Sequence, residues 1–387
     1  MERKITLITN YYPPEMGAAS NRIALMANFF KEYNYDVQVL CPLPNYPTGQ
    51  VFQSYQDKGG LTEEVNGIRV TRLNINPTNS TNLFRRFKAM ISFAYSLWKH
   101  TRKHKSPELV LIQYSPQIVG VISCFLFRSK KHKIILNVSD LWPLAGKELG
   151  HLKPGPVYTA LKYLERYAYR KAHFILGQSQ EILDHIVALF PNKPSFLYRN
   201  FPDFDLPIIQ EKKEGPVRFV YAGLMGVAQG VLSLCKHIKL PDNTELYIYG
   251  SGTESKALEV YITESEKPIF YKGSLSRKEL HHKLMLYDIT LVPLSQRIYG
   301  SVPSKIFEYT KLGLPLIYSG GGEGEGLVKT HKLGWVIKPQ DYDALNMLIK
   351  KLADSTKLSK KNTIRNKSLK VFNAKIQFEN FISFITQ

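Results

Sequence analysis

The chain has 387 residues, of which 44% are hydrophobic and 12% aromatic, and it carries a formal net charge of +20. This composition excludes a disordered or fibrous chain, and the length predicts two globular domains of under about 200 residues each. The charge predicts an anionic partner, for which nucleic acid, a membrane surface and polyanionic substrates are candidates. Cys41, Cys124 and Cys235 have no metal or redox spacing, so we expect buried thiols in a reducing cytoplasm.

No targeting or membrane-spanning segment is expected. The amino-terminal segment 1–15 holds only a short apolar run and no cleavage site of small residues. The longest apolar run, 118–127, has about half the length that crosses a bilayer. We therefore expect a soluble or peripheral protein.

Apolar runs typical of strands alternate with helical patterns in the amino-terminal half. The predicted strands are 4–10, 35–41, 68–73, 108–114, 133–138 and 173–177, and the predicted helices are 18–33, 83–105, 116–128, 156–171 and 179–189. This alternation predicts a parallel sheet covered on both faces.

Three turns after these strands carry candidate site residues. Gly17 lies in the turn after the first strand, where a glycine lets the backbone approach a ligand closely, although a plain structural turn is the alternative. Residues 45–49 follow the second strand in the same way. Asp140 follows the strand 133–138 and suits a partner for an acceptor hydroxyl, or else a cap of the next helix.

The predicted helix 83–105 is a local focus of charge. It carries seven Lys or Arg residues and no acid, and apolar residues recur at 83, 84, 87, 90, 91, 94, 95 and 98. A basic amphipathic helix of this kind can lie on an anionic bilayer. The alternative is a helix whose apolar stripe packs on the sheet and whose basic end is solvated. Both interpretations of the helix can be true at once if the apolar stripe packs inward and the basic flanks touch lipid headgroups.

The pattern restarts after a segment rich in proline and charge. We predict an amino-terminal domain at 1–198, a linker at 199–215, a second domain at 216–370, and a carboxy-terminal helix at 371–387 that packs back on the first domain. The predicted strands are 217–223, 245–250, 268–271, 289–293, 315–318 and a weaker 335–337, and the predicted helices are 228–238, 253–264, 276–286, 303–312 and 341–353. The fold class is therefore α/β, with two Rossmann-like doubly wound domains that face a central cleft.

Glycine-rich turns follow three strands of the second domain. The turn 223–230 contains Gly223 and Gln229 and suits a phosphate. Gly250 and Gly252 follow the next strand, and Gly273 and Leu275 the one after, where they suit a ribose and a base. Each turn is a weak signal alone, but together on one sheet they support a single site.

The segment 301–308 is the most informative motif. A helix that opens near Pro303 would direct backbone N–H groups, the Ser304 hydroxyl and the Lys305 ammonium at one anion. Glu308 lies on the same face and can accept hydrogen bonds from sugar hydroxyls. This combination predicts a nucleotide-sugar pocket. The alternative is an ordinary crossover whose Lys and Glu are solvated.

No metal site and no cofactor are expected. The Asp-x-Asp pairs, Asp203/Asp205 and Asp341/Asp343, lie in the linker and at a helix start, where acids favour the helix dipole. The ten histidines show no paired ligand spacing.

With these motifs aligned, the chain resembles glycosyltransferase family 4, which has the two-domain GT-B fold. The resemblance rests on the segments 11–22, 45–49, 139–143, 228–230 and 303–309, and it is nearest to the subgroup that contains the L-fucosamine transferase WbuB of O-antigen synthesis. It implies a retaining, metal-independent transfer from a nucleotide sugar that the second domain holds, to an acceptor that the first domain holds. Glu308 would contact the ribose, Lys305 and the N–H groups near Ser304 would neutralise the leaving diphosphate, and Gly17 would approach the donor.

The chain departs from the family pattern at four positions. Many members carry a Glu, an Arg, a Lys and a His where this chain has Gly300, Leu224, Gln229 and Ser139. Neutralisation would then depend more on Lys305, with help from Arg297. Acceptor activation would pass to Asp140 or to the leaving phosphate.

The expected protein is a cytoplasmic glycosyltransferase on the inner face of the cell membrane. We expect a UDP-linked donor, with an N-acetylated amino sugar or a deoxy sugar as candidates, and a lipid-linked saccharide acceptor in capsule or O-antigen synthesis. Helix 83–105 would dock on anionic lipid. The alternatives are a nucleotide-sugar epimerase of the same fold and a non-catalytic assembly partner. Nucleic-acid binding has no motif in its favour.

Overall fold

The structure is a computed structural model that describes residues 3–80, 82–105, 107–209, 215–354 and 361–387. The chain divides into two compact units. Unit 1 comprises Met1–Asn200 and Ala374–Gln387, and unit 2 comprises Phe201–Asn373. Part of the predicted linker, 210–214, lies outside the described residues, and 201–209 belong to unit 2.

Unit 1 is built on an eight-stranded sheet of order β3-β4-β2-β1-β5-β6-β7-β8, in which only the β3–β4 pair is antiparallel among the described strands. The strands are β1 (Arg3–Ile8), β2 (Tyr35–Pro42), β3 (Thr62–Val65), β4 (Ile68–Leu73), β5 (Leu109–Gln113), β6 (Lys133–Val138), β7 (Phe174–Gly177) and β8 (Ser195–Leu197). The central strands are apolar on both faces because helices cover both sides. The strand order reverses between β1 and β5, so their carboxyl ends form the edge where such sheets bind ligands.

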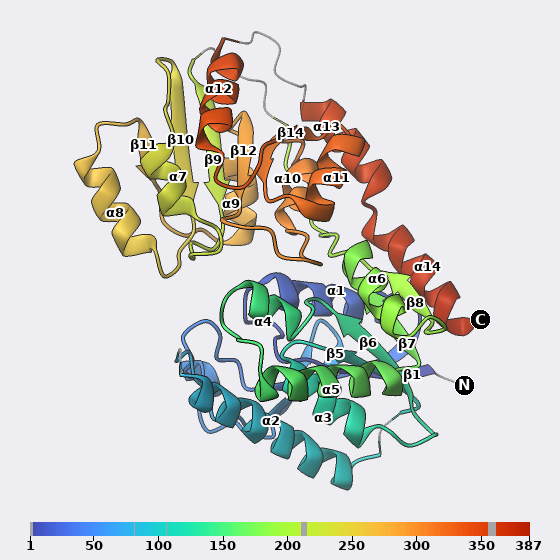
Figure 1. Cartoon of the computed structure of the whole chain (residues 1–387). Coiled ribbons are helices and arrows are strands. Elements are labelled where there is room, and N and C mark those ends of the chain that lie inside the picture. Colours follow the sequence, from blue (N-terminus) through green and yellow to red (C-terminus); the bar gives the residue numbers. More distant parts are fainter. Residues whose placement is uncertain (1–2, 81, 106, 210–214, 355–360) are drawn as a thin grey trace. The chain divides into compact units, whose positions relative to one another are not determined.

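Helices enclose this sheet (Figure 1). They are α1 (Ala18–Glu32), η1 (Gln53–Tyr55), α2 (Leu83–Lys103), α3 (Gln117–Leu126), α4 (Leu144–Glu148), α5 (Pro156–Lys171), α6 (Gln180–Leu189) and α14 (Ala374–Thr386). On one face α2 packs against α3 and α3 against α5, while α1 packs with α14.

Helix α2 buries a different face from the one we predicted. Its inward residues are Ala89, Phe93, Ala94 and Leu97. Most of the predicted apolar stripe points outward, and its members are 39% to 64% exposed: Phe84, Phe87, Ile91, Tyr95 and Trp98. The side chain of Leu83 lies outside the described part. The prediction that the stripe packs inward was therefore wrong, because the apolar positions cover more of the helix than the sheet can bury.

The carboxy-terminal helix α14 belongs to unit 1. Phe378 and Phe381 are fully buried, and their rings contact Phe30 at centroid distances of 5.0 and 6.0 Å. The side-chain amide of Gln377 accepts from the backbone N–H of Arg199 and donates to its carbonyl, both at 2.9 Å. Aromatic packing and this paired hydrogen bond therefore fix α14 to unit 1.

Unit 2 has a six-stranded, fully parallel sheet of order β11-β10-β9-β12-β13-β14. Its strands are β9 (Val217–Ala222), β10 (Thr244–Tyr249), β11 (Ile269–Tyr271), β12 (Ile289–Pro293), β13 (Leu316–Ser319) and β14 (Gly334–Val336). Its helices are α7 (Val231–His237), α8 (Ser255–Glu264), α9 (Arg277–Leu284), α10 (Lys305–Leu312), α11 (Gly322–Thr330), α12 (Tyr342–Ala353) and α13 (Lys361–Val371). One core joins the sheet to α7, α8 and α12. The order reverses between β9 and β12, which predicts a ligand edge at the turns after these two strands.

The structure confirms the predicted alternation and adds elements that the sequence did not reveal. The additional elements are β3, β8, η1, α4, α11 and α13. Strands β3 and β8 are short, and α11 begins in the run Gly320-Gly321-Gly322, which reads as a loop in the sequence.

Candidate functional site

The three predicted glycine turns of unit 2 lie together. Gly223 N donates to the Tyr249 carbonyl at 2.9 Å, and Gly250 N donates to the Gly273 carbonyl at 2.8 Å. A Cβ on Gly250 would lie 1.9 Å from the Gly223 carbonyl oxygen, and one on Gly252 would lie 2.1 Å from the Met225 oxygen. Glycine is therefore required at both positions so that the turns can stack at the carboxyl edge of the sheet.

Lys305 reaches this edge. Its amine donates to the carbonyl of Ala222, next to Gly223, and lies 5.4 and 5.6 Å from the ring centroids of Tyr221 and Tyr309. The side chain is half-buried, and burial lowers the pKa of the amine, while Glu308 opposes that change. The cation therefore lies at the turn that the sequence assigned to a phosphate.

The helix that carries Lys305 begins later than we predicted. Helix α10 starts at Lys305 rather than near Pro303, with Ser304 as its N-cap. The Ser304 side chain makes no capping hydrogen bond, and the carbonyls of Pro303 and Ser304 accept the first N–H bonds of the helix. The backbone N–H groups at this helix start still add positive potential near the lysine.

Glu308 sits one turn along α10 in a charged network that the sequence did not predict. Its Oε1 accepts from His281 Nε2 at 2.8 Å and from Arg277 Nε at 3.1 Å. Burial alone would raise the pKa of Glu308, but the His281 hydrogen bond and the charges of Arg277 and Lys305 outweigh it and lower the pKa to about 2. Glu308 is therefore ionised at neutral pH, and both of its carboxylate oxygens can accept hydrogen bonds.

The other residues predicted to bind the nucleotide sugar differ in their surroundings. Gln229 Oε1 accepts from Gly226 N at 3.2 Å and so closes the turn after β9. Arg297 is exposed, lies 5.8 Å from the Tyr299 ring and passes beside Gly321. Gly273 has a positive φ of 68°, with open space at its Cβ position, and Leu275 is half-buried just before α9.

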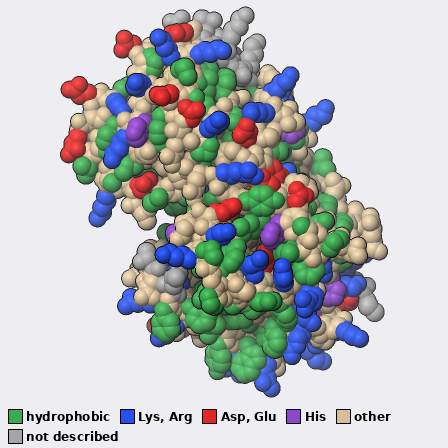
Figure 2. Space-filling view, in the orientation of Figure 1, with side chains coloured by type: hydrophobic (Ala, Val, Ile, Leu, Met, Phe, Trp, Pro, Cys, Tyr) green, Lys and Arg blue, Asp and Glu red, His purple; other side chains and the backbone are tan. Residues whose placement is uncertain are grey.

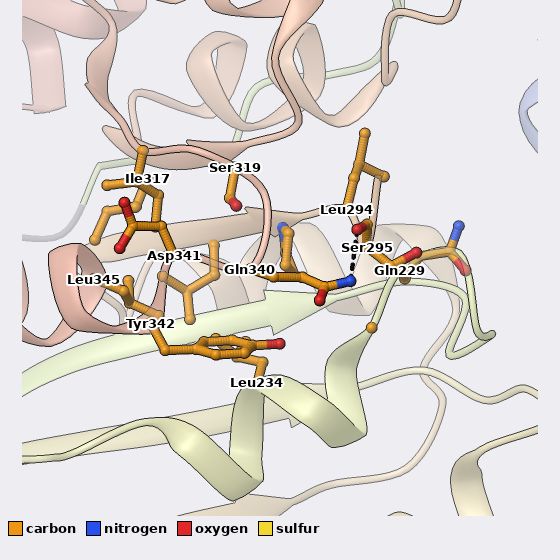
Figure 3. A pocket seen from close by; sticks show the side chains of 14 residues that line it. Gln229, Leu234, Leu294, Ser295, Ile317, Ser319, Gln340, Asp341, Tyr342 and Leu345 are labelled. Atoms are coloured by element: carbon orange, nitrogen blue, oxygen red, sulfur yellow. Dashed lines mark hydrogen bonds between the residues drawn. The ribbon is translucent and has the colours of Figure 1, made fainter. Parts of the chain in front are cut away.

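A narrow cavity near this edge is too small for a nucleotide. It lies between α7 and α12, and Gln340 Nε2 donates to the Ser295 carbonyl across its mouth at 2.7 Å (Figure 3). Its volume of about 30 Å³ suits one or two water molecules. The lining is mainly apolar, with Leu234, Ile317 and Leu345 on its walls. This cavity is therefore not the nucleotide site that the sequence predicts.

In unit 1, two buried charged residues shape the turn that contains Gly17. Glu15 Oε1 accepts from the backbone N–H groups of Asn45 and Tyr46, both at 2.8 Å, and so ties this turn to the one after β2. Arg72 donates to the Pro13 carbonyl of the same turn. Gly17 itself precedes α1 with extended backbone, and a Cβ there would lie 3.9 Å from the Tyr46 ring.

Asp140 follows β6 at the carboxyl edge of the unit 1 sheet. It is half-buried, and burial raises the pKa of its carboxyl group, while the charge of Arg22 lowers it. Arg22, on α1, donates through Nη2 to Ser139 Oγ. An aspartate at this edge can accept a proton from a hydroxyl, which is the chemistry expected of an acceptor site.

Sequence reasoning missed five charged or titratable residues around these sites: Glu15, Arg22, Arg72, Arg277 and His281. One signal was available for Arg22, because it falls four residues before Met26 on the core-facing side of α1. No comparable signal identifies Arg277 or His281, whose partner Glu308 is more than twenty residues away.

The two Asp-x-Asp pairs have other partners. Asp203 pairs with Lys311 at 2.8 Å, and Asp341 caps α12 by accepting from Ala344 N at 3.0 Å. Within the described part of the chain, no group of three or more His, Cys, Asp or Glu residues could hold a metal ion.

Family models match both units. Residues 17–195 match the glycosyl transferase 4-like domain, and residues 205–369 match the glycosyl transferases group 1. A search of curated proteins found no significant relative.

Solved structures with the same fold cover 99% of this chain and 99% of their own. Sucrose-phosphate synthase from Thermosynechococcus elongatus has a TM-score of 0.76 at 14% identity. HepE of Anabaena in complex with UDP and glucose has a TM-score of 0.71 at 14% identity. WaaG, a glycosyltransferase involved in lipopolysaccharide biosynthesis, has a TM-score of 0.67 at 13% identity.

The two-domain fold and the two family matches therefore define an enzyme of the GT-B glycosyltransferase class. More narrowly, the chain belongs to the glycosyltransferases that join a 4-like amino-terminal domain to a group 1 carboxy-terminal domain.

Proposed function

We propose that this glycosyltransferase moves a sugar from a UDP-linked donor, held at the carboxyl edge of the unit 2 sheet, to a saccharide acceptor held by unit 1, with retention and without a metal ion. The observation that carries this proposal is the Lys305 amine at the Gly223 turn, one helical turn from the ionised Glu308. HepE binds UDP and glucose on the same fold, which supports a donor of this class. The bound sugar would be an N-acetylated amino sugar or a deoxy sugar, as in the subgroup that contains the L-fucosamine transferase.

The proposed reaction needs positive charge at the leaving group. The bond between the anomeric carbon and the diphosphate oxygen breaks, UDP leaves with the electron pair, and the acceptor oxygen bonds to the same face of that carbon. Lys305 and the start of α10 stabilise the departing diphosphate, assisted by Arg297. The acceptor proton passes to Asp140 or to the leaving phosphate. Glu308 holds the ribose hydroxyls with the carboxylate oxygen that His281 and Arg277 leave available.

The acceptor would be a lipid-linked saccharide of a capsule or O-antigen pathway, which the enzyme meets on the inner face of the cell membrane. The exposed stripe of α2 supports a membrane surface as a partner, because Lys88 lies 4.7 Å from the Phe84 ring centroid and Arg102 lies 5.2 Å from the Trp98 ring centroid. Aromatic and basic side chains together suit the interface of an anionic bilayer. No helix in the described ranges is long and apolar enough to cross a membrane.

The donor site is tested by thermal shift against a panel of nucleotide sugars, followed by measurement of UDP release. A ligand that binds only the folded state raises its melting temperature. We expect Lys305→Ala to lose about 100-fold or more in transfer, because a diphosphate leaves without its counter-charge. The matched control is Lys329→Ala, since Lys329 is an exposed lysine of the same unit that pairs only with Glu325 among the contacts described.

Full turnover by the Lys305→Ala variant would contradict the assigned role. Isomerisation of a free nucleotide sugar without any acceptor would instead indicate an epimerase. Nucleotide binding without any transfer would indicate an assembly partner.

A further inference from the structure

Two arginines of unit 1 are buried, and they differ in how they are paired. Arg72 is 0% exposed, and each of its nitrogens has a partner. Nε donates to Glu63 at 2.7 Å, Nη1 donates to Cys41 Sγ at 3.3 Å, and Nη2 donates to the Pro13 carbonyl. A buried guanidinium that is fully hydrogen-bonded in this way needs no explanation beyond the structure it supports.

Arg22 is different. It is 3% exposed, and only Nη2 has a hydrogen-bond partner, the Ser139 hydroxyl. Nε and Nη1 are buried without a partner among the described residues. Burying a charged group with unpaired donors destabilises the fold, and hydrophobic side chains of similar size are often at least as stable at such positions. Stability therefore does not explain an arginine at this position.

The surroundings of Arg22 suggest its role. The hydroxyl that it holds belongs to Ser139, directly before Asp140 at the carboxyl edge of the sheet. Asp140 is the acid whose charge acts most on Arg22, and Tyr198 is the other titratable group that faces it. Burial lowers the pKa of Arg22 to about 10, so it stays charged at neutral pH, and its charge opposes the rise that burial causes in the pKa of Asp140.

We propose that Arg22 is a positioning residue of the acceptor site, which fixes the Ser139–Asp140 turn through one nitrogen and supplies a buried positive charge to the Asp140 carboxylate that would receive the proton of an acceptor hydroxyl. This inference rests on the proposed function, since it takes Asp140 as the group that receives the acceptor proton. Arg22 does not touch the reacting atoms. It acts through Asp140. The surrounding structure holds Arg22 in place although its burial lowers the stability of the fold.

Stability is the first test. We expect Arg22→Met to melt within about 5 °C of the unmodified protein, because removing a buried charge with unpaired donors compensates for part of the charge interaction that Asp140 loses. The matched variant Arg72→Met removes a fully paired guanidinium from the same unit, and we expect its melting temperature to fall by about 10 °C. If Arg22→Met falls as far as Arg72→Met, Arg22 is a structural residue and the proposal is overturned.

The second test measures Asp140 directly. Protein labelled with ¹³C-carboxyl aspartate is titrated by NMR, and the Asp140 signal is assigned by its loss in Asp140→Asn. We expect Arg22→Met to raise the titration midpoint by about one pH unit or more, and Arg22→Lys to restore most of the original value, because it keeps the charge. An unchanged midpoint in Arg22→Met overturns the proposal.

The rate of UDP release separates this proposal from the proposed function. The acid limb of the rate against pH should move to higher pH in Arg22→Met, while the thermal shift caused by UDP stays the same. A wild-type pH profile in Arg22→Met overturns the role of Arg22 alone. Absence of UDP release by the unmodified protein with every donor overturns the proposed function, and the NMR titration still decides whether Arg22 controls Asp140.

Discussion

The ionised carboxylate of Glu308 makes the stability of the protein depend on pH, and substitution of this one residue can measure that dependence. The pKa of Glu308 is lowered to about 2, so the hydrogen bond from His281 and the ion pair with Arg277 contribute fully above its ordinary pKa of 4.5. This contribution is lost as the pH falls from about 4.5 toward 2. A depressed carboxyl pKa therefore stabilises the protein at neutral pH and not in acid.

We predict that Glu308→Gln destabilises the protein at pH 7 by on the order of 2 kcal/mol, allowing for the 22% exposure of the side chain. Thermal unfolding at several pH values checks this prediction, and the difference between the two proteins should shrink below about pH 4.5. Glu325→Gln is the control, because Glu325 forms an exposed pair with Lys329. A stability difference that persists unchanged to pH 3 would contradict the assigned pairing.

Local sequence signals identified some site residues and not others. Asp140 could be found because it follows a strand end, where parallel sheets collect ligands. Lys305 and Glu308 could be found because they share one face at the start of a predicted helix. Arg72 could not be assigned in this way, since its contact with Pro13 spans 59 positions of the chain. The role of such a residue depends on contacts with residues far away in the sequence, and these contacts exist only in the folded protein. The assignment of Lys305, Glu308 and Asp140 to chemical roles stays a prediction.

At the scale of elements, the turns after β9 and β10 can pack against each other only because glycines there have no side chains. We predict that Gly252→Ala destabilises unit 2 by about 1–3 kcal/mol, because its Cβ would lie 2.1 Å from the Met225 carbonyl oxygen. Nucleotide binding should weaken as well, since the clash displaces the turn after β9. Urea unfolding and the UDP-induced thermal shift measure the two effects.

Gly326→Ala is the matched control for this substitution. Gly326 lies inside α11 with open space around its Cβ position, so alanine should stabilise the helix by up to about 1 kcal/mol. Equal destabilisation by the two substitutions would show that steric contact between turns is not the cause.

Helix boundaries were more predictable than helix orientation. The pattern at 156–171 matched α5 residue for residue, helped by Gly155 and by Pro156 at its first turn. The pattern at 83–105 located α2 but not its buried side, because the apolar positions extend around most of the helix. Which side is covered depends on α3, and that contact cannot be read from α2 alone.

On the scale of the whole molecule, the net charge of +20 coincides with an exposed apolar surface on unit 1. Figure 2 shows hydrophobic side chains next to Lys and Arg on the face that carries α2. Phe125 of α3, the helix that packs against α2, is also exposed, and Arg128 lies 3.8 Å from its ring centroid. A surface that combines both kinds of side chain should bind anionic bilayers through charge and through burial of rings.

We predict that the protein floats with vesicles that contain phosphatidylglycerol and not with phosphatidylcholine alone, and that salt weakens this binding. The double variant Phe84→Ser, Tyr95→Ser should bind about 10-fold more weakly, because it removes two of the exposed rings. Met347→Ser with Val260→Ser, on unit 2, replaces two residues of similar exposure as a control. A protein that stays at the bottom of the gradient with both lipids would remove the membrane from the proposed function.

The two-unit α/β architecture could be predicted because alternating strands and helices specify parallel sheets. The six strands of unit 2, numbered along the unit, have the order 3-2-1-4-5-6, which follows from short, right-handed crossovers. The parallel strands of unit 1 have the same order, with β8 added at one edge. The edge strand β3 could not be predicted, because its four residues are half exposed and gain their structure by pairing with β4.

The return of α14 to unit 1 affects how the protein is made. Unit 2 is one continuous segment, 201–373. The aromatic cluster of unit 1, in contrast, is complete only after Phe378 and Phe381 of α14 have been synthesised. On the ribosome, the middle of the chain can therefore reach its native fold before the beginning does. A nascent polypeptide that stops short of these two phenylalanines leaves Phe29 and Phe30 uncovered, and it offers chaperones and proteases an unfinished amino-terminal half.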